Sequence, residues 1–170
     1  LDLRVRALAN SRKMWLEPSA LSADDGLAKL AASPRDCDLD AFADHVRTEH
    51  LPHAIILDCS ASNEVAGHYA GWLARGIHVI TPNKQAGAGP LERYAAIRAA
   101  SAATGARFRY EATVGAGLPV IQTLRDLLDT GDTLHAAEGI FSGTLAWLFN
   151  RYDGRMKFSA LVHEANTLGY

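Results

Sequence analysis

The sequence predicts an α/β protein in which part of a doubly wound parallel sheet is followed by the start of a second α/β domain. Three observations predict this fold. Apolar runs of strand length alternate along the chain with segments whose apolar residues recur at helical spacing. The run "HAIILDCS", residues 53–60, is continuously apolar before turn residues, which is typical of a buried parallel strand. The strand–helix–strand order then implies right-handed crossovers that lay helices over the sheet.

The first part of the chain divides into strands and helices by the period of its apolar residues. The helix that follows residues 53–60 ends at Gly76, and a later Ala-rich helix ends near Gly105, because glycine commonly terminates helices. A loop, "NSRKMWLEPS", follows the first strand. We expect strands at residues 3–9, 53–60, 77–81 and 107–113, and helices at residues 25–32, 39–49, 63–75 and 91–103.

After Thr113 the sequence changes character and begins with the glycine-rich turn "VGAGLP". We place a boundary within residues 106–111, so that residues 1–106 form a Rossmann-type nucleotide-binding domain and residues 107–170 begin a second domain. In this second domain we expect helices at residues 120–131, 144–154 and 158–169, and a strand at residues 133–143.

Composition excludes several classes of protein. The 170 residues carry a formal net charge of −2, so nothing favours nucleic acid or an acidic membrane surface as a partner. No apolar run approaches the roughly 20 residues of a membrane helix. Cys37 and Cys59 are too few for a disulfide framework or a zinc site, and a reducing, cytoplasmic setting is expected.

The chain reads as a fragment of a longer protein. It opens directly on a strand pattern and closes on "NTLGY", where a glycine would normally lead onward. A dinucleotide-binding fold needs the turn G-x-G-x-x-G after its first strand. Gly87–Gly89 and residues 115–117 are only G-x-G pieces in other positions. We therefore expect the first strand and its phosphate-binding turn to lie upstream.

Polar residues follow the predicted parallel strands, and ligands of open α/β sheets bind at the carboxyl ends of strands. Thr81, Asn83 and Lys84 follow one strand, and a lysine there can supply positive charge beside a carbonyl or phosphate group. The alternative is an exposed lysine in a loop. Ser60 and Ser62 follow the neighbouring strand and could contact a cofactor, although Ser62 or the next residue could instead cap the following helix.

The end of the first predicted strand also suggests a cofactor contact. In a dinucleotide-binding fold, the second strand ends at the adenosine ribose. Asn10, Arg12 and Lys13 lie at this end without an acidic residue, and cations there attract a 2′-phosphate. This pattern favours NADP over NAD, with a solvated loop as the alternative interpretation.

Five segments together resemble the homoserine dehydrogenase family. They are "LDCSAS", "GIHVITPNK", "YEATVGAGLPVIQTL", "GIFSGTLAWLFN" and "FSALVHEANTLGY". With "VRALANSRKM", the chain looks most like the dehydrogenase half of the bifunctional aspartokinase–homoserine dehydrogenases. The resemblance implies an oxidoreductase that interconverts aspartate 4-semialdehyde and L-homoserine with NAD(P)H, in threonine and methionine biosynthesis. It also implies a homo-oligomer, with residues 107–170 belonging to the catalytic and dimerisation domain.

The resemblance also implies roles for individual residues. Lys84 of "TPNK" matches a lysine beside the nicotinamide, counted with the catalytic or cofactor-binding groups, and Ser60 matches a hydroxyl residue that contacts the cofactor. "EATVGAGLP" matches a sodium-binding loop. The residues implied there are Glu111 and the backbone carbonyls of Val114, Ala116 and Leu118. On the substrate side the resemblance implies Gly143, Thr144 and Tyr170.

Two observations favour an inactive fragment. The chain ends at Tyr170, before the acidic motif and the catalytic lysine that the resemblance implies, and it lacks the phosphate-binding turn. We expect the isolated chain to bind NADP weakly at best. A truncated nucleotide-binding or dimerisation module is the alternative. Aspartate-semialdehyde dehydrogenase is disfavoured, because no loop carrying a nucleophilic cysteine is recognisable.

Overall fold

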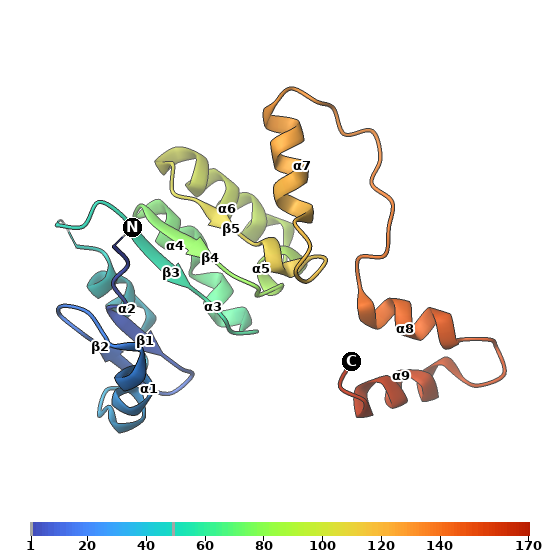
Figure 1. The fold of residues 1–170 in the computed structure, drawn as a ribbon, viewed down its shortest axis with the longest axis horizontal. Helices are drawn as coiled ribbons and strands as arrows, with labels where there is room; N and C mark the ends of the chain where they lie inside the picture. The colour runs from blue at the N-terminus through green and yellow to red at the C-terminus, as the bar shows by residue number, and fades with distance from the viewer. Residues whose placement is uncertain (1, 49) are drawn as a thin grey trace. The chain divides into compact units, whose positions relative to one another are not determined.

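The structure is a computed structural model that describes residues 2–48 and 50–170. It contains two compact units, Leu1–Tyr110 and Glu111–Tyr170 (Figure 1). In the first unit the elements are β1 (Ala7–Ala9), β2 (Met14–Leu16), α1 (Ala23–Ala32), α2 (Leu39–Val46), β3 (Ala54–Leu57), α3 (Asn63–Gly67), α4 (Tyr69–Ala74), β4 (Ile77–Ile80), α5 (Gln85–Ala88), α6 (Leu91–Thr104) and β5 (Phe108–Arg109). In the second unit they are the 3₁₀-helix η1 (Glu111–Thr113), α7 (Val120–Asp129), α8 (Gly143–Arg151) and α9 (Phe158–Thr167).

Strands β3, β4 and β5 form a parallel sheet in that order, which confirms the predicted α/β class. Ala54 pairs with Ile77 and Leu57 with Ile80, so β3 and β4 end together. Strand β5 joins through Val79 and Phe108. Because the strands run in one direction, the loops after β3 and β4 emerge at the same edge of the sheet.

The main core lies on one face of this sheet. Side chains alternate across a strand, so Ile56, Ile77 and Val79 point to the same face, where they are buried. Helices α4 and α6 cover this face with Leu73 and Ile97, both fully buried. The opposite face carries exposed apolar side chains from β3 and β4, namely Ile55, Leu57 and Ile80.

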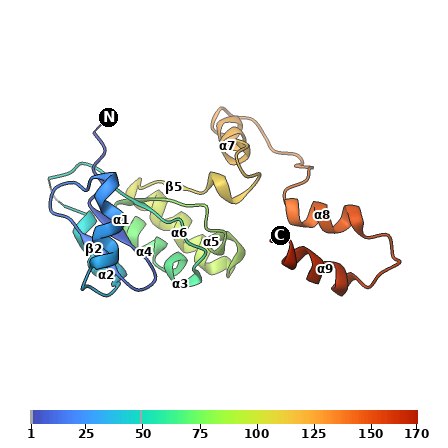
Figure 2. The ribbon, with the colours of Figure 1, turned by 60° about the horizontal axis from the view of Figure 1, so that its bottom comes forward.

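The first predicted strand is shorter than expected and is not part of the parallel sheet. Strand β1 pairs antiparallel with β2 in a separate two-stranded sheet, and α1 packs beside it (Figures 1 and 2). The loop expected at "NSRKMWLEPS" therefore contains a strand. The side chain of Asn10 makes this hairpin possible, because its Oδ1 accepts hydrogen bonds from the backbone N–H groups of Arg12 and Lys13.

Several helices differ from the expected ones at their ends. The single helix expected at residues 63–75 is two, α3 and α4, separated at His68, whose N–H donates to Val65 O. The short helix α5 was not predicted. Helix α2 ends at Val46, and Glu49, the expected last residue, lies outside the described residues. Helix α6 ends at Gly105, whose φ of 74° is the left-handed conformation that glycine adopts readily.

In the second unit the three expected helices are present as α7, α8 and α9. Helices α8 and α9 pack through Leu148, Leu161 and Ala165, with Trp147 against them. The strand expected at residues 133–143 is wrong, because no described residue pairs with this segment and a strand requires a ladder partner. The strand expected at residues 107–113 stops at Arg109, and η1 takes the place of its end. None of the described helices is long and apolar enough to cross a bilayer.

We predict that Ile97→Ala lowers the free energy of unfolding by about 2–5 kcal/mol, because it leaves a cavity in the core between α6 and the sheet. Ile97 is fully buried, whereas Leu91 on the same helix is 77% exposed. The control Leu91→Ala should therefore change the free energy by less than about 0.5 kcal/mol. Urea unfolding followed by circular dichroism measures both, and equal losses would contradict this core.

Candidate functional site

The carboxyl ends of β3 and β4 are joined by hydrogen bonds between the residues that follow each strand. Asp58 N donates to Ile80 O at 3.0 Å. Thr81 Oγ1 donates to Asp58 O at 2.9 Å. The two loops thus leave the sheet side by side, and they carry Ser60 and Lys84.

A buried polar cluster lies at this junction and consists of Asp58, Tyr69, Thr81 and Asn83, each no more than 6% exposed. The hydroxyl of Tyr69 donates to Asp58 Oδ2 and lies 3.0 Å from Thr81 Oγ1. Asn83 Nδ2 donates to Asp58 Oδ2 at 3.0 Å. The backbone N–H of Ser60 donates to Asp58 Oδ1 at 2.7 Å. The buried carboxylate therefore accepts from a helix and from both loops.

Burial and hydrogen bonding act on Asp58 in opposite directions. Burial alone raises the pKa of this carboxyl group, but the hydrogen bonds from Tyr69, Ser60 and Asn83 outweigh it, so the pKa is lowered overall. Burial, together with the bond to Asp58, raises the pKa of the Tyr69 hydroxyl above its usual value. At neutral pH the cluster thus contains an ionised Asp58 and a protonated Tyr69.

Ser60 and Lys84 are both exposed at the rim formed by the two loops. Ser60 Oγ accepts from Ser62 N at 3.2 Å. Ser62 caps α3, since its Oγ accepts from Val65 N at 3.3 Å, which confirms the capping interpretation for this residue. Lys84 occupies the position before α5. The structure therefore brings the two predicted cofactor residues to one edge of the sheet.

Sequence reasoning missed Asp58 and Tyr69. One signal in the sequence could have indicated Asp58: it is an acidic residue directly after a buried strand, and ligands of open α/β sheets bind at such strand ends.

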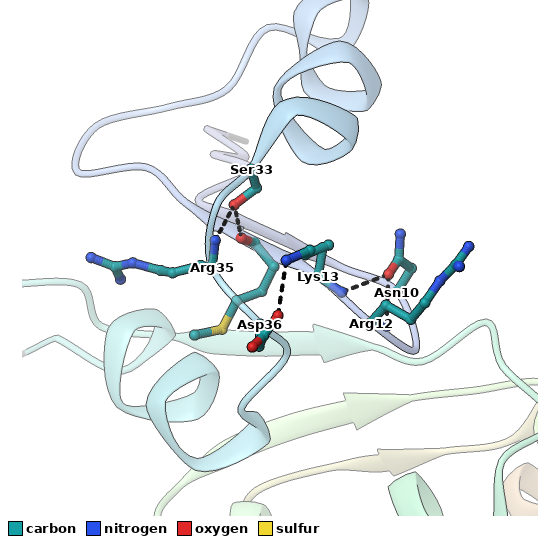
Figure 3. Close-up of polar contacts among 7 residues, drawn as sticks. Asn10, Arg12, Lys13, Ser33, Arg35 and Asp36 are labelled. Atoms are coloured by element: carbon teal, nitrogen blue, oxygen red, sulfur yellow. Dashed lines mark hydrogen bonds and ion pairs between the residues drawn. The ribbon is translucent and has the colours of Figure 1, made fainter.

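The turn that carries Asn10, Arg12 and Lys13 lies in the β1–β2 hairpin (Figure 3). Asn10 Oδ1 is engaged by the two backbone N–H groups of the turn, at 2.9 and 2.8 Å. Lys13 Nζ lies 2.8 Å from Asp36 Oδ1, and this hydrogen bond lowers the pKa of the Asp36 carboxyl. The expectation that no acid lies at this strand end is thus wrong.

The error has a tertiary cause. The segment around Asp36 runs antiparallel to the start of β2, with Cys37 N donating to Arg12 O and Met14 N to Arg35 O. Pairing of distant segments thus brings a carboxylate against Lys13. The exposed side chains of Arg12 and Arg35 extend from this region in different directions (Figure 3).

In the second unit, Glu111 is the first residue of η1, and its side chain reaches the first turn of α7. Its Oε1 accepts from Ile121 N at 2.9 Å. Gly115 and Ala116 both adopt positive φ, 71° and 51°, and the value for Ala116 is unusual because it has a side chain. An irregular loop of this kind can direct backbone carbonyls to one point, and carbonyl and carboxylate oxygens are the donors that hard cations take. The carbonyl of Leu118, however, already accepts from Val120 N at 2.9 Å.

The predicted substrate residues lie at the start of α8 and after α9 in the second unit. Gly143 and Thr144 begin α8, which Ser142 caps by accepting from Leu145 N at 3.2 Å. The ring of Tyr170 stacks on Trp147 of α8, with centroids 5.2 Å apart. No group of three or more His, Cys, Asp or Glu side chains suited to a metal ion occurs among the residues that the structure describes.

Comparison with known proteins identifies the family. A sequence profile described as "Homoserine dehydrogenase, NAD binding domain" matches residues 1–111, and one described as "Homoserine dehydrogenase" matches residues 119–170. The chain belongs to the homoserine dehydrogenase family.

Similar proteins include bifunctional enzymes from plants and bacteria. The chain is 47% identical to bifunctional aspartokinase/homoserine dehydrogenase 1, chloroplastic, of maize, over 100% of the chain and 19% of that relative. It is 39% identical to bifunctional aspartokinase/homoserine dehydrogenase 2 of Escherichia coli, over 93% of the chain and 20% of that relative. The chain thus spans about a fifth of the length of these relatives.

Solved structures have the same fold. A putative homoserine dehydrogenase from Archaeoglobus fulgidus matches with a TM-score of 0.68 and 27% identity, over 99% of this chain and 51% of that one. A Candida auris protein described as of unknown function matches with a TM-score of 0.75 and 34% identity, over 98% and 48% of the two chains. A hyperthermophilic archaeal homoserine dehydrogenase, described as in complex with NADPH, matches over 96% and 51% of the chains with a TM-score of 0.68; at 19% identity it shows the fold alone.

We predict that Tyr69→Phe lowers the free energy of unfolding by about 1–3 kcal/mol at pH 7, because the buried carboxylate loses a donor. The pKa of Asp58 is lowered by folding, so its contribution to stability is present above the unfolded pKa of about 3.9 and is lost as the pH falls through the folded pKa. The difference in the free energy of unfolding between Tyr69→Phe and the original chain should therefore become smaller below about pH 4.

Urea titrations at pH 7 and pH 3 measure this difference. Tyr152→Phe makes the same chemical change at a residue that is 43% exposed, and it should alter stability little at either pH. A Tyr69→Phe difference that is the same at both pH values would show that the hydroxyl does not act through an ionised carboxylate.

Proposed function

We propose that the polypeptide containing this chain is a homoserine dehydrogenase that interconverts aspartate 4-semialdehyde and L-homoserine with NAD(P)H. The reaction belongs to threonine and methionine biosynthesis. The observation that carries the proposal is the shared rim of β3 and β4, where Ser60 and Lys84 emerge from hydrogen-bonded loops. Membership of the family and the parallel sheet support a nicotinamide cofactor at this edge.

Lys84 is the residue proposed to act on the reacting groups. In the direction of reduction, the aldehyde carbon receives a hydride and its oxygen gains a proton. The bound reduced nicotinamide supplies the hydride. An exposed ammonium group at the end of a rigid strand can stabilise negative charge as it develops on the oxygen or hold the cofactor beside it. The Ser60 hydroxyl is proposed to contact the cofactor at the same rim.

We propose NADP as the preferred cofactor, with Asn10 and Arg12 at the adenosine end. Asn10 shapes the hairpin turn through its side chain, and Arg12 stands exposed on that turn. Because Lys13 is paired with Asp36, Arg12 is the side chain that we assign to a 2′-phosphate. A guanidinium group suits this role because it forms bidentate hydrogen bonds with phosphate oxygens.

The second unit is proposed to serve the substrate and a sodium ion. Gly143, Thr144 and Tyr170 are assigned to the substrate, supported by the stacking of Tyr170 on Trp147 of the helix that Gly143 and Thr144 begin. Glu111 and the carbonyls of Val114, Ala116 and Leu118 are assigned to sodium. The positive φ of Ala116 supports a loop shaped for a ligand. The Leu118 carbonyl already accepts a hydrogen bond from Val120 N, and a sodium ion would have to share this oxygen or displace that bond.

The domain roles and the assembly are part of the same proposal. Residues 1–106 are assigned to nucleotide binding and residues 107–170 to the catalytic and dimerisation domain of a homo-oligomer. Exposed apolar side chains such as Phe141 and Phe149 support an interface in the second unit. The cytoplasmic setting stays a prediction, because the maize relatives are described as chloroplastic.

We predict that Lys84→Ala in the full-length protein lowers kcat/KM for aspartate 4-semialdehyde by about 10²–10³-fold, the range for losing one charge-stabilising group. Oxidation of NADPH followed at 340 nm measures the effect. Lys157→Ala, which changes an exposed lysine of the second unit, should leave the rate unchanged. Unchanged kinetics of Lys84→Ala would remove this residue from the site, and absence of turnover by the original full-length protein would favour a non-catalytic module.

We predict that Arg12→Ala weakens NADPH binding by about tenfold or more and leaves NADH binding nearly unchanged, because NADH lacks the 2′-phosphate. Loss of a charge-assisted hydrogen bond is worth about 1.5–3 kcal/mol, and 1.4 kcal/mol is tenfold in affinity. Fluorescence titration with NADPH and with NADH measures the affinity of the variant and of the original protein for each coenzyme. Arg98→Ala on α6, also an exposed arginine, should change neither affinity. Equal weakening for both coenzymes would refute a 2′-phosphate contact.

A further inference from the structure

Asp58 is unusual among the buried polar residues of the described chain. Ser33, Asp58, Tyr69, Thr81 and Asn83 are buried, and of these only Asp58 is charged at neutral pH. An ionised group inside a protein is expensive unless every lone pair finds a donor. A feature of this kind is rarely needed for stability alone, since well-packed apolar side chains often replace buried charges without loss.

The bonds of Asp58 connect the two loops that carry Ser60 and Lys84. One carboxylate oxygen accepts from the Ser60 backbone N–H at 2.7 Å. The other accepts from Asn83 Nδ2 at 3.0 Å. The second N–H of the Asn83 amide donates to Ser62 O at 2.8 Å, so this side chain also crosses between the loops.

Lys84 lies in a turn whose backbone is fixed by hydrogen bonds of Asn83. Asn83 N donates to Thr81 Oγ1 at 2.9 Å, and Asn83 Oδ1 accepts from Gln85 N at 3.0 Å. The residues on both sides of Lys84 are thus fixed by one side chain, which is itself bonded to Asp58. A continuous chain of hydrogen bonds runs from the backbone of Ser60 through Asp58 and Asn83 to the turn that presents Lys84.

Only a carboxylate satisfies this arrangement. The groups that face the two oxygens of Asp58 are all donors: a backbone N–H, an amide N–H and a phenol O–H. An asparagine in its place has the same shape but would turn an NH₂ group toward at least one of these donors. The substitution therefore tests the hydrogen bonding with almost no change in volume.

We propose that Asp58 is a positioning residue that acts through Asn83 and the Ser60 backbone to hold the Lys84 and Ser60 loops in register for the nicotinamide cofactor. This proposal rests on the proposed function, in which Ser60 and Lys84 at the rim serve the cofactor, and it adds a residue that positions them. The Tyr69 hydroxyl on α4 also donates a hydrogen bond to the Asp58 carboxylate and so helps to hold it in place. The side chain of Asp58 itself need not touch substrate or cofactor.

The test is a double-mutant cycle in the full-length protein, combining Asp58→Asn with Lys84→Ala. We expect Asp58→Asn alone to lower kcat by about tenfold or more. If Asp58 acts through Lys84, adding Asp58→Asn to Lys84→Ala should lower kcat by less than about threefold. A merely structural role predicts independent effects, so that the two losses multiply. Multiplying losses would overturn the proposal.

A matched control separates positioning from general destabilisation. Ser101 Oγ donates to Ala106 O at 2.6 Å at the amino end of the same sheet, far along the strands from the rim. Ser101→Ala should lower the melting temperature but leave kcat unchanged. An equal loss of kcat in Ser101→Ala and Asp58→Asn would overturn the proposal.

A milder variant covers the case in which Asp58→Asn does not fold. Tyr69→Phe keeps the carboxylate and removes one donor, and it should lower kcat by about threefold with the same non-additivity toward Lys84→Ala. Unchanged kcat in Tyr69→Phe would then overturn the proposal. If Lys84→Ala itself has no effect, the proposed function fails and this inference falls with it; if Lys84→Ala is impaired but the cycle is additive, the inference fails alone.

Discussion

A carboxylate buried at the end of a strand has to be surrounded by hydrogen-bond donors, and this requirement organises the first unit of the chain. The donors to Asp58 come from three separate segments: Tyr69 on α4, Asn83 after β4, and the backbone of Ser60 after β3. Satisfying one charged group therefore fixes a helix and two loops at once. Apolar contacts pack the strands against the helices, whereas hydrogen bonds to Asp58 fix the positions of the loops that follow β3 and β4.

The cluster also explains how exposed side chains can have defined positions. Ser60 and Lys84 are exposed, and long exposed side chains are usually mobile. Here the backbone of Ser60 and the backbone beside Lys84 are held by hydrogen bonds to the buried side chains of Asp58 and Asn83. A rigid support beneath adaptable side chains is an arrangement that binding sites on loops commonly require.

The β1–β2 turn shows how a local sequence pattern can be altered by a distant segment. Arg12 and Lys13 read as a pair of cations, yet a bridge to the chain around Asp36 places a carboxylate beside Lys13. Antiparallel pairing with β1 converts part of an expected loop into β2, because backbone partners from another segment allow an extended conformation. Conversely, a strand is expected at residues 133–143, but this segment has no described partner and forms none.

The sequence by itself determined the α/β class, the parallel strands around residues 54–57 and 77–80, most of the helices, and the edge at which Ser60 and Lys84 emerge. These features follow from local periodicity and from the rule that parallel strands share one carboxyl edge. Only the tertiary structure decided which donors surround Asp58, that Tyr69 turns its hydroxyl toward it, and that Asp36 meets Lys13. The contacts of Tyr69 with Asp58 and of Lys13 with Asp36 join residues 11 and 23 positions apart, and the period of a sequence carries no information about which distant groups will meet.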